Sequence, residues 1–273
     1  MPINICVLIS SLGLFCLIHA SSAQSAQLRL RMATTTSTDN SGLLKQLNPA
    51  FESQSGVRID VIAVGTGKAL KLGENGDVDL VFVHAPGAEK TFVAAGYGLK
   101  RFAVMHNDFI IIGPKSNPAG LNEHQSGSEA LRRVAQSQAI FISRGDESGT
   151  HKKEQQLWQG TGISPQGNWY LATGQGMGAV LQIAADKDAY TLTDRGTYIA
   201  YQKKIKLKIL NQGSAELFNP YHIIAVNPQR HPHTKTDLAN QYIRFVTGPA
   251  GQKLIASYRL GGQQLFYPDV IQE

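Results

Sequence analysis

Cysteine is nearly absent from this chain of 273 residues. The two that occur, Cys6 and Cys16, both lie near the N-terminus, so a chain processed after them has no cysteine and can form no disulfide in an oxidising compartment. Packing must then stabilise the fold without cross-links. A hydrophobic content of 42% over this length is enough for a sizeable core in one large or two modest domains.

Charge is absent from the first 27 residues, which contain no Asp, Glu, Lys or Arg. They include the apolar stretch V-L-I-S-S-L-G-L-F-C-L-I, followed by small residues with Ser21 and Ala23 at the −3 and −1 positions of a cleavage site. This pattern predicts a signal peptide over residues 1–23, although its first residues lack the usual Lys or Arg.

The alternatives for this segment are a membrane anchor and a lipid attachment site. The apolar stretch is shorter than the ~20 residues that a membrane span requires. Gly13 and Phe15 fit poorly before a lipid-modified Cys16. We therefore expect a soluble, exported protein that resides in the periplasm.

Dense basic runs are also scarce, although the formal net charge is +6. A positive field attracts anions, but the scattered Lys and Arg do not indicate nucleic acid as a partner. The run K-K-I-K-L-K (203–208) is the exception. Its alternation with Ile205 and Leu207 predicts a half-buried strand with a solvated lysine face.

Strand-like and helix-like stretches alternate along the chain, without internal repeats or low-complexity tracts. This order predicts an α/β fold with helices covering mainly parallel sheets. Strands are expected at 28–33, 57–64, 78–83, 107–114, 139–143, 168–172, 189–193 and 219–228. Helices are expected at 39–54 with Asp39 or Ser41 as N-cap, from about residue 66, and at 149–159, 177–187, 195–203, 236–247 and 249–257.

Two crossings of the chain divide this series into two lobes. The turn-rich stretch after residue 114 predicts the first crossing, and the strand at 219–228 predicts the return. Lobe one is expected to comprise 27–114 plus 221–273, and lobe two 115–220. A cleft between two lobes is the default place for a ligand.

The turn S-R-G-D-E-S-G-T-H (143–151) lacks the spacing of the common catalytic motifs. A nucleophile elbow needs G-x-S-x-G, but Gly145 lies three residues before Ser148. The stretch V-G-T-G-K-A (64–69) has Ala69 where a phosphate loop needs Ser or Thr. We therefore expect no enzyme. An enzyme acting on phosphorylated substrates, or an adhesion module using Arg-Gly-Asp, is a weaker alternative.

An anion-binding site is the remaining interpretation of this turn. Ser148, Gly149 and Thr150 begin a predicted helix, whose first N–H groups lack internal partners and whose dipole favours negative charge. Arg144 adds a planar guanidinium group, whose N–H donors suit the geometry of oxyanions. The alternative is an ordinary helix start, with Ser148 as cap and Arg144 paired with Asp146.

Four further turns follow predicted strands in the same way: A-T-T-T-S-T-D-N-S-G (33–42), G-T-G (65–67), T-G-Q-G-M-G (173–178) and T-L-T-D-R-G-T (191–197). In open α/β sheets, ligands bind outside the carboxyl ends of the strands. The turns together predict a small anion bound by helix termini and hydroxyls. The candidate ligand-binding residues are Thr34, Thr35, Thr36, Ser37, Thr66, Gly67, Arg144, Ser148, Gly149, Thr150, Gly176 and Arg195.

Four long segments resemble the TupA-type family of tungstate-binding periplasmic proteins of ABC transporters: A-T-T-T-S-T-D-N-S-G-L-L, F-I-S-R-G-D-E-S-G-T-H-K-K-E, T-G-Q-G-M-G-A-V-L-Q-I-A-A-D-K and A-Y-T-L-T-D-R-G-T-Y. The resemblance implies a type II periplasmic-binding-protein fold that closes over one tetrahedral tungstate and delivers it to an ABC permease. Its T-T-T-S motif falls on Thr34–Ser37 and its arginine on Arg144. The other contacts are inferred from turn position. We expect a monomer with no cofactor besides this ligand.

Asp146 decides between tungstate and phosphate as the ligand. Tungstate has no proton at neutral pH and needs only donors, whereas phosphate retains a proton and needs an acceptor. The R-G-D-E-S-G-T turn also resembles R-x-D-x-S-G-T of phosphate-binding proteins. We expect Asp146 to turn away and orient Arg144, with phosphate binding as the alternative. Only the family resemblance ranks tungstate above molybdate, which has nearly the same size and charge.

Other polar and aromatic candidates have simpler interpretations. The H-P-H sequence (231–233) is expected in a loop without a metal site. His84, His106 and His151 lie near the same strand ends. We expect them to be structural histidines, with contact to the anion as the alternative. Trp158 and Trp169 are expected in the core.

Overall fold

The structure is a computed structural model and describes residue 1 and residues 27–269. The predicted signal peptide therefore lies, apart from Met1, outside the described residues. In the part that is described, no helix is long and apolar enough to cross a membrane.

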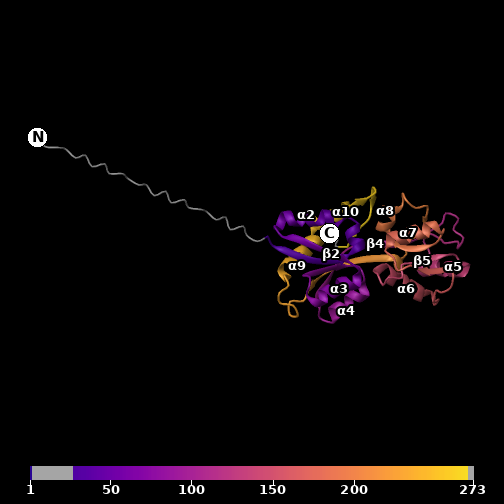
Figure 1. Cartoon of the computed structure of the whole chain (residues 1–273), viewed down its shortest axis with the longest axis horizontal. Helices are drawn as coiled ribbons and strands as arrows, with labels where there is room; N and C mark the ends of the chain where they lie inside the picture. Colours follow the sequence, from indigo (N-terminus) through magenta and orange to yellow (C-terminus); the bar gives the residue numbers. More distant parts are fainter. Residues whose placement is uncertain (2–26, 270–273) are drawn as a thin grey trace.

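The described chain forms two lobes (Figure 1). The elements of lobe one are β1 (Arg29–Thr35), α1 (Thr36–Asn40), α2 (Leu44–Ser55), β2 (Arg58–Val64), α3 (Thr66–Asn75), β3 (Leu80–Val83), α4 (Pro86–Ala94), α9 (Thr236–Thr247), α10 (Pro249–Ser257), β10 (Arg259–Leu260), β11 (Gln263–Gln264) and β12 (Tyr267–Pro268). Those of lobe two are α5 (Gly127–Ser137), β5 (Phe141–Ser143), α6 (Gly149–Thr161), β6 (Tyr170–Ala172), α7 (Met177–Asp186), β7 (Thr191–Asp194), α8 (Arg195–Tyr201), β8 (Lys208–Asn211) and the 3₁₀ turn Ala215–Leu217.

Two long strands join the lobes: β4 (Gly98–Gly113) and β9 (Phe218–Val226). In lobe one the sheet order is β12-β4-β9-β3-β1-β2. Residues 98–108 of β4 pair with β9 in this sheet, whereas residues 109–113 pair with β7 and β8 of lobe two. One strand therefore belongs to the sheets of both lobes.

The sheets are mixed rather than mainly parallel. The expected parallel pairing holds for β1 with β2 and β3, and for β5 with β6. The crossing strands add the antiparallel pairs, since β9 runs opposite to β3 and β4, and β4 opposite to β7 and β8. Parallel β1, β2 and β3 end at one edge of the sheet, and this edge faces lobe two.

Each lobe has its own hydrophobic core on both faces of its sheet. In lobe one, Leu30 and Met32 pack on one face, and Ala33 and Val81 on the other. Lobe two is packed in the same manner, with Trp158 and Trp169 in one of its two clusters. Both tryptophans are more than 90% buried, so the prediction that they are core residues is confirmed.

Two sequence predictions differ from the structure. The helix expected at 39–54 is two helices, because Thr35 Oγ1 accepts from Thr38 N and starts a short helix of its own. A turn with Gly42 at φ 84° then separates α1 from α2. Neither Asp39 nor Ser41 is an N-cap.

The run at 203–208 is not a strand. Helix α8 ends at Tyr201, and strand pairing with β4 begins only at Lys208, opposite Gly113. Ile205 and Leu207 are buried in the core of lobe two, as their alternation with lysines predicted. The burial pattern was therefore right, but the backbone between α8 and β8 has no strand partner in the described chain.

Candidate anion-binding site

Three helices begin at one cavity between the lobes. Helices α1 and α3 follow β1 and β2 of lobe one, and α6 follows β5 of lobe two. The cavity has a volume of about 440 Å³. Its lining includes the predicted residues Thr35, Thr36, Ser37, Thr66, Gly67, Arg144, Ser148, Gly149 and Thr150. Strand ends and helix starts from both lobes thus converge, as expected for an anion-binding site.

The start of α3 offers donors that the protein leaves unpaired. Its N-cap, Gly65, has no side chain to accept from the first N–H groups of the helix. Thr66 Oγ1 is buried and has no hydrogen-bond partner among the described residues, and the residue is only 1% exposed. A buried hydroxyl without a partner is costly, so Thr66 Oγ1 is a candidate donor to a bound anion.

Arg144 and Asp146 form an ion pair at the wall formed by lobe two. Arg144 Nη2 donates to Asp146 Oδ2 at 2.5 Å, and Ser148 N donates to Asp146 Oδ1 at 3.2 Å. Burial disfavours the charge of Asp146, but the hydrogen bonds from Ser148 and the positive charge of Arg144 outweigh it and lower the pKa of this carboxyl. Asp146 is thus an ionised acceptor that is engaged by the protein itself.

This geometry contains the features expected of an ordinary helix start. Ser148 Oγ accepts from His151 N at 3.3 Å and caps α6, and Arg144 is paired with Asp146. However, Arg144 Nε is buried without a hydrogen-bond partner in the described chain. A capped helix and a paired arginine therefore do not use all the donors that this wall presents.

The two walls of the cavity approach closely at Gly149. A Cβ atom on this residue would lie 3.3 Å from Thr66 Oγ1 and 3.4 Å from His84 Cε1. The absence of a side chain lets the start of α6, from lobe two, lie directly against two residues of lobe one. An anion beside Thr66 would therefore contact both lobes.

His84 lines the cavity, although the expectation from the sequence was a structural histidine, with contact to the anion as the alternative. Its Nε2 lies 3.1 Å from Thr35 Oγ1 and 3.1 Å from Ser37 Oγ, and its Nδ1 lies 2.9 Å from Asn219 Oδ1. Burial lowers its pKa, against the opposing effect of the Asn219 hydrogen bond. The imidazole is therefore neutral at neutral pH and both supports and lines the cavity.

Two lysines of the cavity were also missed, Lys68 on α3 and Lys152 on α6. They lie one or two residues beyond the predicted Gly67 and Thr150, and the helix spacing could have identified them. His106 and His151 agree with their expected structural roles, since His106 Nδ1 pairs with Asp269 and His151 Nδ1 accepts from Glu147 N. The described residues contain no group of three or more His, Cys, Asp or Glu that could hold a metal ion.

Gly176 and Thr34 lie beside the cavity rather than in its lining. Gly176 lines an adjoining cavity together with Thr36, Ser37 and Arg144, where α7 begins. Thr34 is fully buried, and its Oγ1 donates to Phe82 O at 2.7 Å. Its hydroxyl thus joins β1 to β3.

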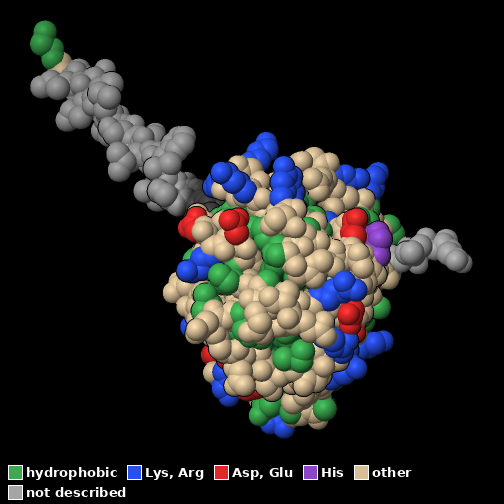
Figure 2. All heavy atoms as spheres, turned by 90° about the vertical axis from the view of Figure 1, so that its right-hand side faces the viewer, with side chains coloured by type: hydrophobic (Ala, Val, Ile, Leu, Met, Phe, Trp, Pro, Cys, Tyr) green, Lys and Arg blue, Asp and Glu red, His purple; other side chains and the backbone are tan. Residues whose placement is uncertain are grey.

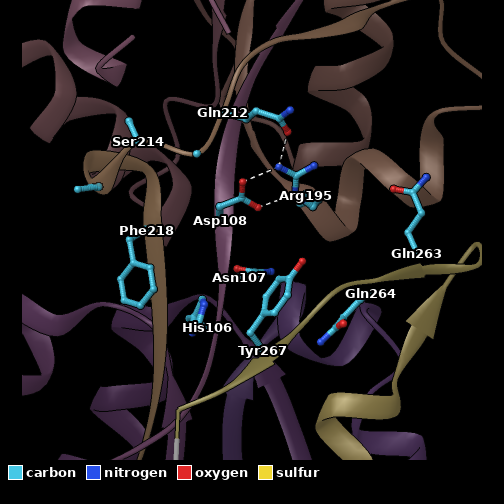
Figure 3. Close-up of a pocket in the computed structure, with 12 residues that line it drawn as sticks. His106, Asn107, Asp108, Arg195, Gln212, Ser214, Phe218, Gln263, Gln264 and Tyr267 are labelled. Atoms are coloured by element: carbon cyan, nitrogen blue, oxygen red, sulfur yellow. Dashed lines mark hydrogen bonds and ion pairs between the residues drawn. The ribbon is translucent and has the colours of Figure 1, made fainter. Parts of the chain in front are cut away.

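Arg195 lies in a different and larger cavity of about 850 Å³ (Figure 3). Its Nε and Nη2 donate to the two carboxylate oxygens of Asp108 at 2.6 and 2.5 Å, and Nη2 also donates to Gln212 Oε1 at 2.7 Å. The guanidinium therefore fixes the start of α8 to the middle of β4. The structure does not bring it to the cavity that contains Arg144, contrary to the inference from turn position.

The two-lobed fold and the donor-lined cavity between the lobes define a solute-binding protein, and a family profile described as "PBP superfamily domain" matches residues 20–250. The chain is 43% identical over 242 residues to a tungstate-binding protein TupA of Peptoclostridium acidaminophilum, covering 87% of this chain and 85% of the relative.

Two solved structures are similar throughout. One is the tungstate-binding protein TupA from Desulfovibrio alaskensis G20, with 49% identity, a TM-score of 0.82 and coverage of 89% of this chain and 99% of that one. The other is described as the tungstate ABC transporter from Geobacter sulfurreducens, with 58% identity, a TM-score of 0.78 and coverage of 85% and 100%. The chain belongs to the TupA-type family of this superfamily.

Proposed function

We propose that this protein captures tungstate in the cavity between its lobes, in the periplasm, and delivers it to the permease of an ABC transporter. The observation that carries the proposal is a pair of unused buried donors, Thr66 Oγ1 and Arg144 Nε, whose residues line one cavity from opposite lobes. The identity to TupA proteins of known ligand supports tungstate as the anion.

The engaged state of Asp146 favours an anion without a proton. Its two oxygens already accept from Arg144 and Ser148, so a protonated phosphate would have to share an acceptor that the protein uses. Tungstate and molybdate both meet this requirement. Sulfate meets it as well, but its S–O bonds are shorter, so the same donors would enclose it less closely.

The remaining features of the proposal concern its partners. We propose a monomer that binds no nucleic acid and has no cofactor besides its ligand. On the face shown in Figure 2, Lys and Arg form separate groups between uncharged areas rather than one continuous stripe. Scattered positive charge suits the attraction of a small anion from solution.

A hydrolase is the second candidate, because Ser37, His84 and Asn219 are connected like a nucleophile, a base and an orienting group. Ser37 Oγ shares its imidazole with Thr35 Oγ1, however, and Asn219 provides no negative charge to stabilise an imidazolium. We therefore propose a carrier, and we expect no turnover of p-nitrophenyl phosphate or p-nitrophenyl acetate. Turnover that is lost in Ser37→Ala would establish the hydrolase instead.

Titration calorimetry of the chain from residue 24 onward, with tungstate, molybdate, sulfate and phosphate, tests the proposed function. We expect tungstate to bind most tightly, with one site per chain. Equal affinity for molybdate would define a carrier for both anions. Tighter binding of phosphate would mean that Asp146 faces the ligand.

A further inference from the structure

His84 joins the anion cavity to the two strands that connect the lobes. One side of its ring contacts the hydroxyls of Thr35 and Ser37. The other side contacts Asn219 on β9, whose Nδ2 donates to Asn107 Oδ1 on β4 at 2.6 Å. The residue is 6% exposed, and its ring stacks on Tyr221 with the ring centroids 4.6 Å apart.

With the amides of Asn219 and Asn107 in this orientation, the contacts define the tautomer of the neutral ring. Asn219 uses its Nδ2 as a donor to Asn107, so its Oδ1 faces His84 and can only accept. Nδ1 of His84 therefore carries the hydrogen, and Nε2 is an acceptor. One of the hydroxyls that contact Nε2 must donate to it, and that hydrogen is not available to an anion in the cavity.

Protonation of His84 reverses this arrangement. An Nε2–H group would donate to a hydroxyl oxygen, and the hydrogens of Thr35 and Ser37 could both point into the cavity. The ring would also add a positive charge next to the anion. For a ligand that only accepts hydrogen bonds, the protonated ring gives the better site.

Burial and the charged groups around His84 explain why its ring is neutral in the absence of an anion. Burial opposes its charge, and the nearby Arg144 opposes it further. Lys68 and Lys152 line the same cavity and add to the positive field, whereas Asp146 and Glu147, which also line it, oppose this field. Asp194 of β7 and Glu89 of α4 favour the charge but do not outweigh burial. A dianion in the cavity would add two negative charges, and these favour the protonated form of His84.

We propose that His84 takes up a proton from solution when a tetrahedral dianion binds, so that anion capture is coupled to protonation of one buried imidazole. This inference rests on the proposed function. It predicts that tungstate affinity falls by about tenfold per unit of pH in the range where the empty protein is unprotonated and the complex is protonated.

Titration calorimetry with sodium tungstate at about pH 7.5, in buffers that differ in ionisation enthalpy, measures the proton uptake directly. We expect close to one proton per tungstate for the unmodified chain, and close to none for His84→Gln, which retains a donor and an acceptor but does not titrate. Glu154→Gln is the control, since Glu154 is a buried carboxyl outside the cavity whose pKa of about 7 lies close to the pH of the measurement. We expect it to retain the uptake.

Tungstate binding without proton uptake, or equal uptake in the unmodified chain and in His84→Gln, would overturn the inference. Absence of tungstate binding in the unmodified chain would instead reject the proposed function. A second measurement needs no variant: with ¹⁵N-labelled histidine, the Nε2 resonance of His84 should change from an unprotonated to a protonated nitrogen on addition of tungstate. An Nε2 that remains unprotonated in the complex would also overturn the coupling.

Discussion

At the scale of single residues, the unpaired hydroxyl of Thr66 predicts that one substitution will raise the stability of the empty protein and lower its affinity for tungstate. Thr66→Val removes a buried donor without a partner while retaining the shape of the side chain. We expect the empty protein to be stabilised by up to about 1–3 kcal/mol, and the affinity for tungstate to fall by roughly 10- to 100-fold. Urea unfolding and titration calorimetry measure the two effects.

The control for this residue is Thr66→Ser, which retains the hydroxyl and should change the affinity by less than about threefold. Arg144→Ala should cost more affinity than Thr66→Val, because charge-assisted bonds are roughly twice as strong as neutral ones. An equal or smaller loss in Arg144→Ala than in Thr66→Val would contradict the arrangement of the anion at the wall of lobe two.

Asp146 is predicted to act through Arg144 and not on the ligand. In Asp146→Asn, the bond from Arg144 Nη2 loses its negative acceptor and becomes weaker, so the orientation of the guanidinium is less well defined. We expect weaker tungstate binding with an unchanged preference for tungstate over phosphate, measured by competition. A gain in affinity for sulfate would mean that the carboxylate faces the anion and repels it.

At the scale of elements, one buried carboxyl joins α6 to β5 and β6. Glu154 accepts from Ser143 Oγ at 2.8 Å, Tyr170 OH at 2.8 Å and Trp158 Nε1 at 3.1 Å. Burial raises its pKa from 4.5 to about 7, although these hydrogen bonds oppose the shift. The folded state thus retains a proton that the unfolded state releases above about pH 4.5.

The stability contributed by this proton is complete at low pH and is lost as the pH rises through about 7. Glu154→Gln can retain all three partners, because Ser143 Oγ can accept from the amide. We expect the variant to be more stable than the unmodified chain at about pH 8, by on the order of 3 kcal/mol, and similar to it at about pH 5. Urea unfolding at both pH values measures this.

Glu147→Gln removes an equal charge from an exposed side chain on the preceding turn and serves as the control. If the unfolding free energy of Glu154→Gln varied with pH as it does in the unmodified chain, the buried carboxyl would not be the source of the effect.

Much of the site could be predicted at the scale of elements, because a strand end followed by a helix start is a local signal. The turns at 33–37, 65–67 and 144–150 were identified in this way, and the structure brings them together. His84 follows β3 at the same sheet edge, and this position was a signal for it.

Contacts between residues far apart in the chain explain why some features could not be predicted from the sequence. Arg195 has the same local pattern as Arg144, but Asp108 on β4 occupies its guanidinium, and no local rule couples residues so far apart in the chain. The long strand β4 was expected only from residue 107, since the polar residues of its first half obscure its alternation. The lobe boundaries at 114 and 220 stay a prediction.

At the scale of the whole molecule, an anion bound by both lobes should make them unfold together. A ligand present at about a thousandfold its Kd stabilises the folded state by about 4 kcal/mol, which corresponds to a rise in Tm of roughly 10 °C for a chain of this size. The only two tryptophans, Trp158 and Trp169, are both in lobe two, so their fluorescence reports on that lobe.

We expect tungstate to shift the tryptophan-detected and the calorimetric transitions by the same amount. A calorimetric shift without a change in the tryptophan-detected midpoint would indicate that only lobe one binds the anion.

Strand β4 also determines how the cavity can open. A strand that is hydrogen-bonded into two sheets cannot slide along either of them without breaking its ladder, so the lobes can separate only by bending or twisting of the backbone near residues 108 and 109, where its partners change. We expect these residues to act as the hinge between the lobes, and neither of them lines the proposed anion cavity. Bending at these residues would separate the donors of one lobe from those of the other, so we expect a bound anion to be released by opening of the lobes rather than by competition from other anions.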